Sequence, residues 1–222
     1  PYASLDPRKS VVEIIAEYMI INRTYPSKKE IYNYAAHLMD IVGLARRYAN
    51  AYPHELDGGR RQRIGIARAL SLHPKFIVCD EPVSALDVSI QAQILNMLMR
   101  LKMELGLSLL FISHDIGVIR FISDRIGVMY LGTLVEETST ETLFEHPLHP
   151  YTKTLLAAIP DPYIQGEDFQ VLSGEQPVRT EDFQGCAFYS RCPYAKEICK
   201  KEAPVFREVE PGHKAACYCI EE

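Results

Sequence analysis

Two acidic residues follow a short apolar run near the middle of the chain. Residues 76–82 read FIVCDEP, so Asp80 and Glu81 stand where a predicted buried strand ends. In an open α/β sheet, ligands bind at the carboxyl ends of parallel strands. Because adjacent strand residues face opposite sides, we expect Asp80 to serve a magnesium ion and Glu81 an attacking water, as in a nucleotide hydrolase. Two solvated acids at a strand end are the alternative.

Two more polar residues stand close to the same predicted edge. The run LSLLFI (107–112) predicts a second strand, and His114 follows it in FISHD. A neutral imidazole there can hold a phosphate oxygen or orient a water, although a lone histidine at a strand end is often incidental. SALD (84–87) ends in Asp87, which is well placed to cap a helix beginning at Val88. Capping alone would explain that aspartate.

A pair of glycines opens another predicted helix. Residues 54–63 read HELDGGRRQR, and apolar residues follow at helical spacing. Gly58 and Gly59 thus lie in a first helical turn, where each costs about 1 kcal/mol relative to alanine. We therefore expect something at this helix start to require bare backbone.

The cysteines are concentrated at the C-terminal end. Cys186, Cys192, Cys199 and Cys217 are separated by five, six and seventeen residues, with Cys219 beside the last. Disulfides are disfavoured in reducing compartments, and the gaps are wider than the CxxC pairs of a zinc ribbon. Four thiolates in an irregular, Pro-rich segment can hold an iron–sulfur cluster. Zinc, with His213 as an alternate ligand, and a reduced tail without metal are the other interpretations.

The elements that position these residues are those of an α/β fold. Helical periodicity in 10–20, 28–42 and 58–70 predicts a helical subdomain over about residues 10–70. A sheet core over about 74–138 contains the two strands above, a helix from Val88 to about Glu104, a helix over 115–122, and strands on either side of Gly132. Strands alternating with helices imply right-handed crossovers and a parallel sheet. Helices over 140–144 and 151–159 follow, and a Pro-, Gly- and Cys-rich composition places a domain boundary near 161–170.

Composition excludes several classes of protein. The 222 residues are 47% apolar and 24% charged, as in an ordinary globular protein. A net charge of -5 argues against a basic surface for nucleic acid. No apolar run approaches the roughly 20 residues that span a bilayer, and there is no signal peptide at Pro1, so we interpret the chain as a fragment whose membrane role depends on partners.

The order of these features resembles the nucleotide-binding subunit of ATP-binding cassette (ABC) transporters, a P-loop NTPase fold. Residues 56–60 (LDGGR) stand where that family has its LSGGQ signature, 76–81 match the Walker B strand, 84–87 the D-loop, and His114 the switch histidine. The chain is most similar to the ATPase subunits of oligopeptide and dipeptide importers. That similarity is carried by PYASLDPR, DEPVSALDVSIQAQILN, SDRIGVMYLG, HPLHPYTKTLLAAIP and GCAFYSRCPYAKEIC.

The resemblance implies a specific role for each of these residues. Glu81 is the catalytic base, Asp80 contacts Mg²⁺ and His114 contacts the γ-phosphate of ATP. Leu56, Asp57, Gly58, Gly59, Arg60 and Asp87 face a nucleotide held by a second ATPase subunit. Residues 1–160 correspond to the later part of the ATPase domain, and 161–222 to a Cys-rich module that the family associates with a [4Fe-4S] cluster at Cys186, Cys192, Cys199 and Cys217.

This sequence departs from the family pattern at three points. Aspartate replaces serine at position 57, where a carboxylate caps the helix well but repels a phosphate, and Arg60 replaces glutamine and can offset that charge. No GxxxxGK[ST] phosphate loop occurs in these residues, so we expect the chain by itself to bind ATP poorly and to be inactive.

The expected partners are a second ATPase subunit, two transmembrane permease subunits and, indirectly, a peptide-binding protein, with the ATPase peripheral on the cytoplasmic face of the membrane. Nucleic acid is not expected. A non-transport ABC ATPase and a catalytically incompetent binding fragment are the alternative functions.

Overall fold

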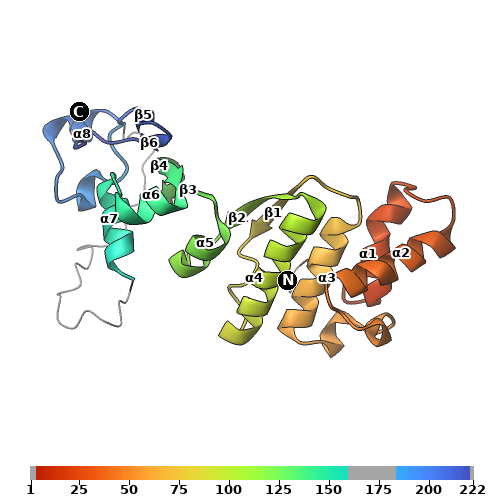
Figure 1. Cartoon of the computed structure of the whole chain (residues 1–222). Helices are drawn as coiled ribbons and strands as arrows, with labels where there is room; N and C mark the ends of the chain where they lie inside the picture. The colour runs from red at the N-terminus through yellow and green to blue at the C-terminus, as the bar shows by residue number, and fades with distance from the viewer. Residues whose placement is uncertain (1–3, 160–183, 221–222) are drawn as a thin grey trace. The chain divides into compact units, whose positions relative to one another are not determined.

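The computed structural model describes residues 4–159 and 184–220. The chain divides into two compact units, Pro1–His114 and Asp115–Glu222 (Figure 1). Each unit has its own sheet, so the residues that the sequence analysis singled out fall into two separate groups.

The first unit begins with the predicted helical subdomain. It contains α1 (Val11–Ile21), α2 (Lys28–Ile41) and α3 (Gly58–Leu70), with two short 3-10 helices, η1 (Arg46–Tyr48) and η2 (Pro53–Glu55), between α2 and α3. Ser27 caps α2 by accepting a hydrogen bond from the backbone of Glu30. The chain leaves α2 through Gly43, whose φ of 68° is a left-handed conformation that glycine adopts without a Cβ clash. Buried aliphatic residues hold the three helices together: Ile14, Ile15, Met19, Leu38, Met39 and Ile64.

A parallel strand pair follows the helical subdomain. β1 (Phe76–Asp80) pairs in parallel with β2 (Ser108–Ile112), and α4 (Val88–Leu105) connects them. Helices α3 and α4 pack on each other beside this pair (Figure 1). Cys79 is 8% exposed, and burial raises the pKa of its thiol to about 11, as fits a core cysteine. The parallel arrangement predicted from the sequence is confirmed for these two strands. The predicted burial of β1 is wrong for the described residues: Phe76 and Val78 are 55% and 54% exposed, because the sheet has two strands only and one face is left uncovered.

The second unit is built around an antiparallel sheet. Its elements in chain order are α5 (Ile116–Ile122), β3 (Arg125–Tyr130), β4 (Thr133–Ser139), α6 (Thr140–Glu145), α7 (Pro150–Ala157), η3 (Tyr189–Arg191), α8 (Glu197–Lys201), β5 (Arg207–Glu210) and β6 (His213–Ala215). The strand order is β3-β4-β6-β5. The two strands expected around Gly132 thus form a hairpin, and two C-terminal strands, which the sequence pattern did not predict, complete the sheet.

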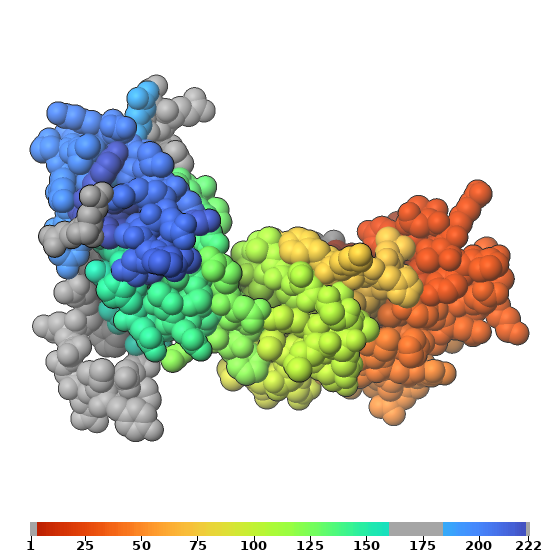
Figure 2. Space-filling view, turned by 45° about the horizontal axis from the view of Figure 1, so that its top comes forward, coloured from red at the N-terminus to blue at the C-terminus, as the bar shows by residue number. Residues whose placement is uncertain are grey.

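The C-terminal residues share the core of the second unit. Phe188 is 1% exposed and packs with Ile126, Val128, Tyr130, Val135 and Leu143 of the β3–β4 hairpin and α6. Figure 2 shows the C-terminal residues, in blue, lying against the teal residues that include β4 and α7. The domain boundary expected near 161–170 lies outside the described residues. On either side of it, residues 125–145 and 186–215 contribute to one sheet and one core.

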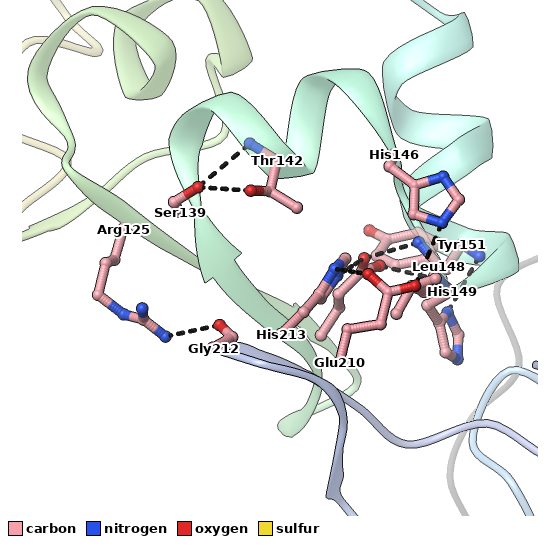
Figure 3. Close-up of polar contacts among 11 residues, drawn as sticks. Arg125, Ser139, Thr142, His146, Leu148, His149, Tyr151, Glu210, Gly212 and His213 are labelled. Carbon is pink, nitrogen blue, oxygen red and sulfur yellow. Dashed lines mark hydrogen bonds and ion pairs between the residues drawn. The ribbon is translucent and has the colours of Figure 1, made fainter. Parts of the chain in front are cut away.

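A buried carboxylate forms hydrogen bonds that connect β4, β6 and the start of α7. Glu136 on β4 is fully buried and accepts hydrogen bonds from the backbone amides of Leu148 (2.7 Å) and His149 (2.9 Å) at the start of α7. The same carboxylate lies 2.7 Å from Nε2 of His213 on β6. Figure 3 shows His213, Leu148 and His149 close together. A negative charge at the N-terminal end of a helix is electrostatically favourable, so Glu136 stabilises α7 as well as the strand pairing.

Candidate active site and signature helix

Glu81 and His114 meet at the carboxyl ends of β1 and β2. Oε1 of Glu81 lies 2.8 Å from Nδ1 of His114, and the amide of Glu81 donates to the carbonyl of Ile112 at 3.0 Å, which continues the strand pairing by one residue. Oε2 of Glu81 is buried and has no hydrogen-bond partner in the described part of the chain. The structure therefore brings the predicted base and the predicted switch histidine together, and leaves one carboxylate oxygen of Glu81 without a hydrogen bond in the described part of the chain.

The backbone of Glu81 explains how its side chain reaches this position. Its φ is 47°, in the left-handed region that non-glycine residues rarely occupy. Strain of this kind typically persists where the surroundings fix it, and it is concentrated at functional sites. The turn ends β1 at Asp80 and directs Glu81 along the strand end toward His114.

Asp80 is suited to a magnesium ion by its chemistry and its exposure. It is the last residue of β1, exposed, and its carboxylate forms no hydrogen bond or ion pair within residues 4–159 and 184–220. Magnesium is typically held by one or two carboxylates together with water and substrate phosphates. A single uncommitted carboxylate next to Glu81 fits that donor set.

Asp57 caps α3 and forms an ion pair with Arg60. Oδ1 accepts a hydrogen bond from the backbone N–H of Arg60 at 2.8 Å, and Oδ2 lies 2.6 Å from Nη1 of the same residue. Both side chains are substantially exposed, and the preceding Leu56 is buried at 4% exposure, which anchors the helix start. The compensation of Asp57 by Arg60 that the sequence suggested is therefore present in the structure.

The two glycines have a packing reason that the sequence pattern did not reveal. A Cβ at Gly59 would lie 2.6 Å from Cγ2 of Ile90, and one at Gly58 would lie 3.0 Å from Cδ2 of Leu86. Contacts under 3.0 Å are not tolerated between carbon atoms, so Gly59 must lack a side chain for α3 to approach α4. The absence of side chains at Gly58 and Gly59 is therefore needed for close helix packing. It would also leave the backbone amides of these glycines accessible to a phosphate.

Asp87 does not cap α4 with its side chain. It occupies the N-cap position before Val88, but its carboxylate makes no capping hydrogen bond and the residue is exposed. The interpretation of Asp87 as a simple helix cap is therefore wrong. The backbone of Asp87 is extended, as it is at the capping residues Ser27 and Asp57, so the difference lies in the orientation of its side chain.

The C-terminal cysteines lie in one region without forming a metal centre. All are reduced, and burial raises the pKa of the Cys186 thiol, with smaller contributions from Cys199, Cys192 and Cys219. Sγ of Cys219 donates to the carbonyl of Tyr194 at 2.8 Å. Among the described residues, no three His, Cys, Asp or Glu side chains are arranged to hold a metal ion. His213, the alternate zinc ligand, is instead paired with Glu136.

Comparisons with known proteins cover both units. Residues 2–84 match the family model described as "ABC transporter", and residues 135–199 match "Oligopeptide/dipeptide transporter, C-terminal region". YkfD of Bacillus subtilis (strain 168) is 52% identical over 98% of this chain and 67% of its own length. "Oligopeptide transport ATP-binding protein AppF" of the same organism is 49% identical over the same shares. The chain belongs to the oligopeptide-transporter family of ABC ATPases.

A solved ABC cassette supports the same fold. The ATP-binding cassette MJ0796, in a dimeric post-hydrolysis state bound to ADP and Pi, is 33% identical with a TM-score of 0.55, over 61% of this chain and 59% of that one. By its family, the chain is an ABC-type ATPase. Its described helices include none that is both long and apolar enough to cross a lipid bilayer.

Three features of this ABC ATPase were not found from the sequence. Ile90 is recognisable only as one of several apolar residues on its helix, and nothing in its spacing indicates that it faces Gly59. Glu136 lies in the strand segment TLVEE, and the only signal for its role is that an acid there is unusual if the residue is buried. Tyr48 carried no signal, because its ring meets Arg60 only after the chain between them has folded.

Proposed function

We propose that this protein is the subunit that binds and hydrolyses ATP to power the import of peptides by an ABC transporter. The observation that carries the proposal is the 2.8 Å pairing of Glu81 with His114 at the strand ends, in the same unit as the LDGGR helix start. Similarity to oligopeptide transport ATP-binding proteins supports peptides as the substrate class. The expected location is the cytoplasmic face of the membrane, in contact with two permease subunits that receive substrate from a peptide-binding protein.

In this function Glu81 accepts a proton from the water that attacks the γ-phosphate. Its buried Oε2 has no partner among the described residues, and its Oε1 is fixed by His114, so the base is oriented before the substrate arrives. His114 contacts the γ-phosphate with its other ring nitrogen. Asp80 would hold Mg²⁺, and the ion would supply positive charge to offset that of the phosphates.

The start of α3 faces a nucleotide held by a second ATPase subunit. The backbone amides of Gly58 and Gly59, at the positive end of a 13-residue helix, are donors suited to a phosphate. Asp87, which is exposed and free of a capping role, lies in the segment that adjoins the same helix start through Leu86. The dimeric state of MJ0796 is consistent with this arrangement of two cassettes.

The decisive experiment replaces Glu81 in the intact transporter complex. Glu81→Gln keeps the shape of the side chain and removes its basicity. We expect ATP turnover to fall by a factor of about 10² to 10⁴ while ATP binding is retained. Peptide uptake into proteoliposomes should stop in parallel. Turnover close to that of the unchanged protein would refute the assignment of Glu81, and ATP hydrolysis without peptide uptake in the unchanged complex would refute the transport function.

The C-terminal cysteines are proposed, more narrowly, as ligands of a [4Fe-4S] cluster. What supports this is that Cys199, Cys192 and Cys219 lie close enough to Cys186 to influence the pKa of its thiol. In the structure they do not form a metal-binding group, so loading would require their side chains to rearrange. Absorbance near 400 nm with matching iron and sulfide in anaerobically purified protein is the expected result. Colourless protein with stoichiometric zinc, or with no metal, would overturn it.

A further inference from the structure

The ring of Tyr48 contacts two guanidinium groups beside the start of α3. Cζ of Arg60 lies 4.8 Å from the ring centroid and Cζ of Arg47 lies 5.1 Å from it. Both distances are within the roughly 6 Å over which an aromatic face attracts a cation. Nη2 of Arg47 also donates a hydrogen bond to the Tyr48 hydroxyl at 3.3 Å. The Tyr48 ring therefore restricts the positions that the Arg60 guanidinium can adopt.

The backbone that carries Tyr48 is firmly held. Tyr48 closes η1 through a 3.0 Å hydrogen bond from its amide to the carbonyl of Ala45. The carbonyls of the next turn, at Ala49 and Ala51, accept hydrogen bonds from the first amides of α1 at 3.0 and 2.9 Å. These bonds connect the segment after Tyr48 to the start of α1. The backbone position of Tyr48, and with it the position of its ring, is therefore fixed relative to α1.

Arg60 differs from the two other arginines that follow the glycines. Arg61 donates to the carbonyl of Pro53 at 2.6 Å, and Arg63 donates to the carbonyl of Val42 at 2.5 Å, so both tie α3 to neighbouring backbone. The Arg60 side chain instead lies at the surface between the Asp57 carboxylate and the Tyr48 ring. Its guanidinium lies 2.6 Å from the carboxylate of Asp57, the acidic residue of LDGGR.

We propose that Tyr48 is a positioning residue for ATP hydrolysis, which holds the Arg60 guanidinium against Asp57 at the surface that receives the nucleotide. The inference rests on the proposed function. An uncompensated carboxylate at position 57 repels the γ-phosphate, whereas a held ion pair presents donors and no net charge. Tyr48 thus acts together with Asp57 and Arg60, the two residues that depart from the LSGGQ pattern, although it lies nine residues before Asp57.

The test compares variants of Tyr48 in the intact transporter complex by their KM for ATP. Tyr48→Leu removes the aromatic face, and we expect KM to rise about three- to tenfold. Tyr48→Phe keeps the face, so its KM should stay within about twofold of the unchanged value. Tyr52→Leu is the matched control, because Tyr52 is an exposed tyrosine nearby whose ring stacks on His54 instead of an arginine.

A second background separates positioning from folding. The double variant Asp57→Ser, Arg60→Gln removes both charges, so Tyr48→Leu should leave KM unchanged there. An equal rise of KM in both backgrounds would overturn the inference, as would a Tyr48→Phe variant as impaired as Tyr48→Leu. If turnover in the double variant is too low to measure, ATP binding to the corresponding Glu81→Gln complexes gives the same comparison. These outcomes are distinct from failure of the proposed function, which would appear as Glu81→Gln retaining turnover.

Discussion

Oε1 of Glu136 and Nε2 of His213 lie 2.7 Å apart, with side chains that are 0% and 1% exposed. They are 77 residues apart in the chain. With the amides of Leu148 and His149, they join β4, β6 and the start of α7 through one carboxylate (Figure 3). Removing one partner of such a buried pair leaves an uncompensated group in the interior.

Glu136→Ala should therefore destabilise the protein strongly. We expect the free energy of unfolding to fall by about 3–5 kcal/mol, because the substitution leaves His213 and two backbone amides without their acceptor. Urea unfolding followed by circular dichroism measures the change. Glu137→Ala is the matched control: Glu137 is the next residue of the same strand and pairs with Arg125 at the surface, where we expect a loss below about 1 kcal/mol. Similar losses for the two variants would contradict the role assigned to Glu136.

Stability should also fall in mild acid through His149. The imidazole is 1% exposed, burial lowers its pKa from 6.5 to about 4, and Nδ1 must remain unprotonated to accept a hydrogen bond from Tyr151 N at 3.1 Å. The unfolded chain thus binds a proton that the folded chain excludes. This contribution is complete above pH 6.5 and is lost as pH falls toward 4, on the order of 3 kcal/mol in total.

The variant that checks this is His149→Asn, which keeps an acceptor at the N-cap but does not titrate. Its free energy of unfolding should depend less steeply on pH between 6.5 and 4 than that of the unchanged protein. Identical pH profiles would show that another group is responsible.

Gly59 offers a way to separate packing from nucleotide contact. Gly59→Ala should destabilise the protein despite the higher helix propensity of alanine, because the new Cβ would lie 2.6 Å from Cγ2 of Ile90. Ile90→Leu removes the branch at Cβ, so the double variant should recover much of the lost stability in a thermal melt. If ATP turnover stays low after stability is recovered, the bare backbone is needed for the nucleotide as well. A single variant as stable as the unchanged protein would disprove the close approach.

Asp87→Ala should change stability little and activity more. Its carboxylate makes no capping hydrogen bond, so we expect the free energy of unfolding to change by less than about 0.5 kcal/mol. Ser27→Ala is the comparison, since Ser27 caps α2 and its loss should cost about 1 kcal/mol. Lower ATP turnover in a stable Asp87→Ala complex is the expected result. A stability loss equal to that of Ser27→Ala would restore the capping interpretation.

Much of the first unit could be predicted from the sequence because its signals are local. Helices α2, α3 and α4 have periodic apolar faces, and the residue before each is Ser27, Asp57 or Asp87, types that favour helix starts. The run FIVCD predicted β1 because a short apolar segment followed by acids is typical of a buried parallel strand. Order along the chain, together with the rule that parallel strands end at one edge, placed Glu81 near His114.

The C-terminal part was harder to predict because its stability depends on long-range contacts. β5 and β6 have four and three residues, too few for an alternating pattern to be recognised. β6 forms where it can pair with β4, and the ladder includes Glu136 opposite Ala215. No local rule predicts that a charged residue of a strand will be buried against a histidine from a distant segment.

Residue types and their order along the chain predicted a nucleotide hydrolase, and the resemblance to ABC ATPases assigned roles to the two acids, the histidine and the glycine pair. The tertiary structure decided which of these residues act together. It showed that the side chain of Asp87 makes no capping hydrogen bond, that a Cβ at Gly59 would clash with Ile90, and that Arg60 pairs with Asp57. The physical reason is that these relationships depend on distances between side chains brought together by packing, whereas the sequence specifies directly only what lies within a few residues.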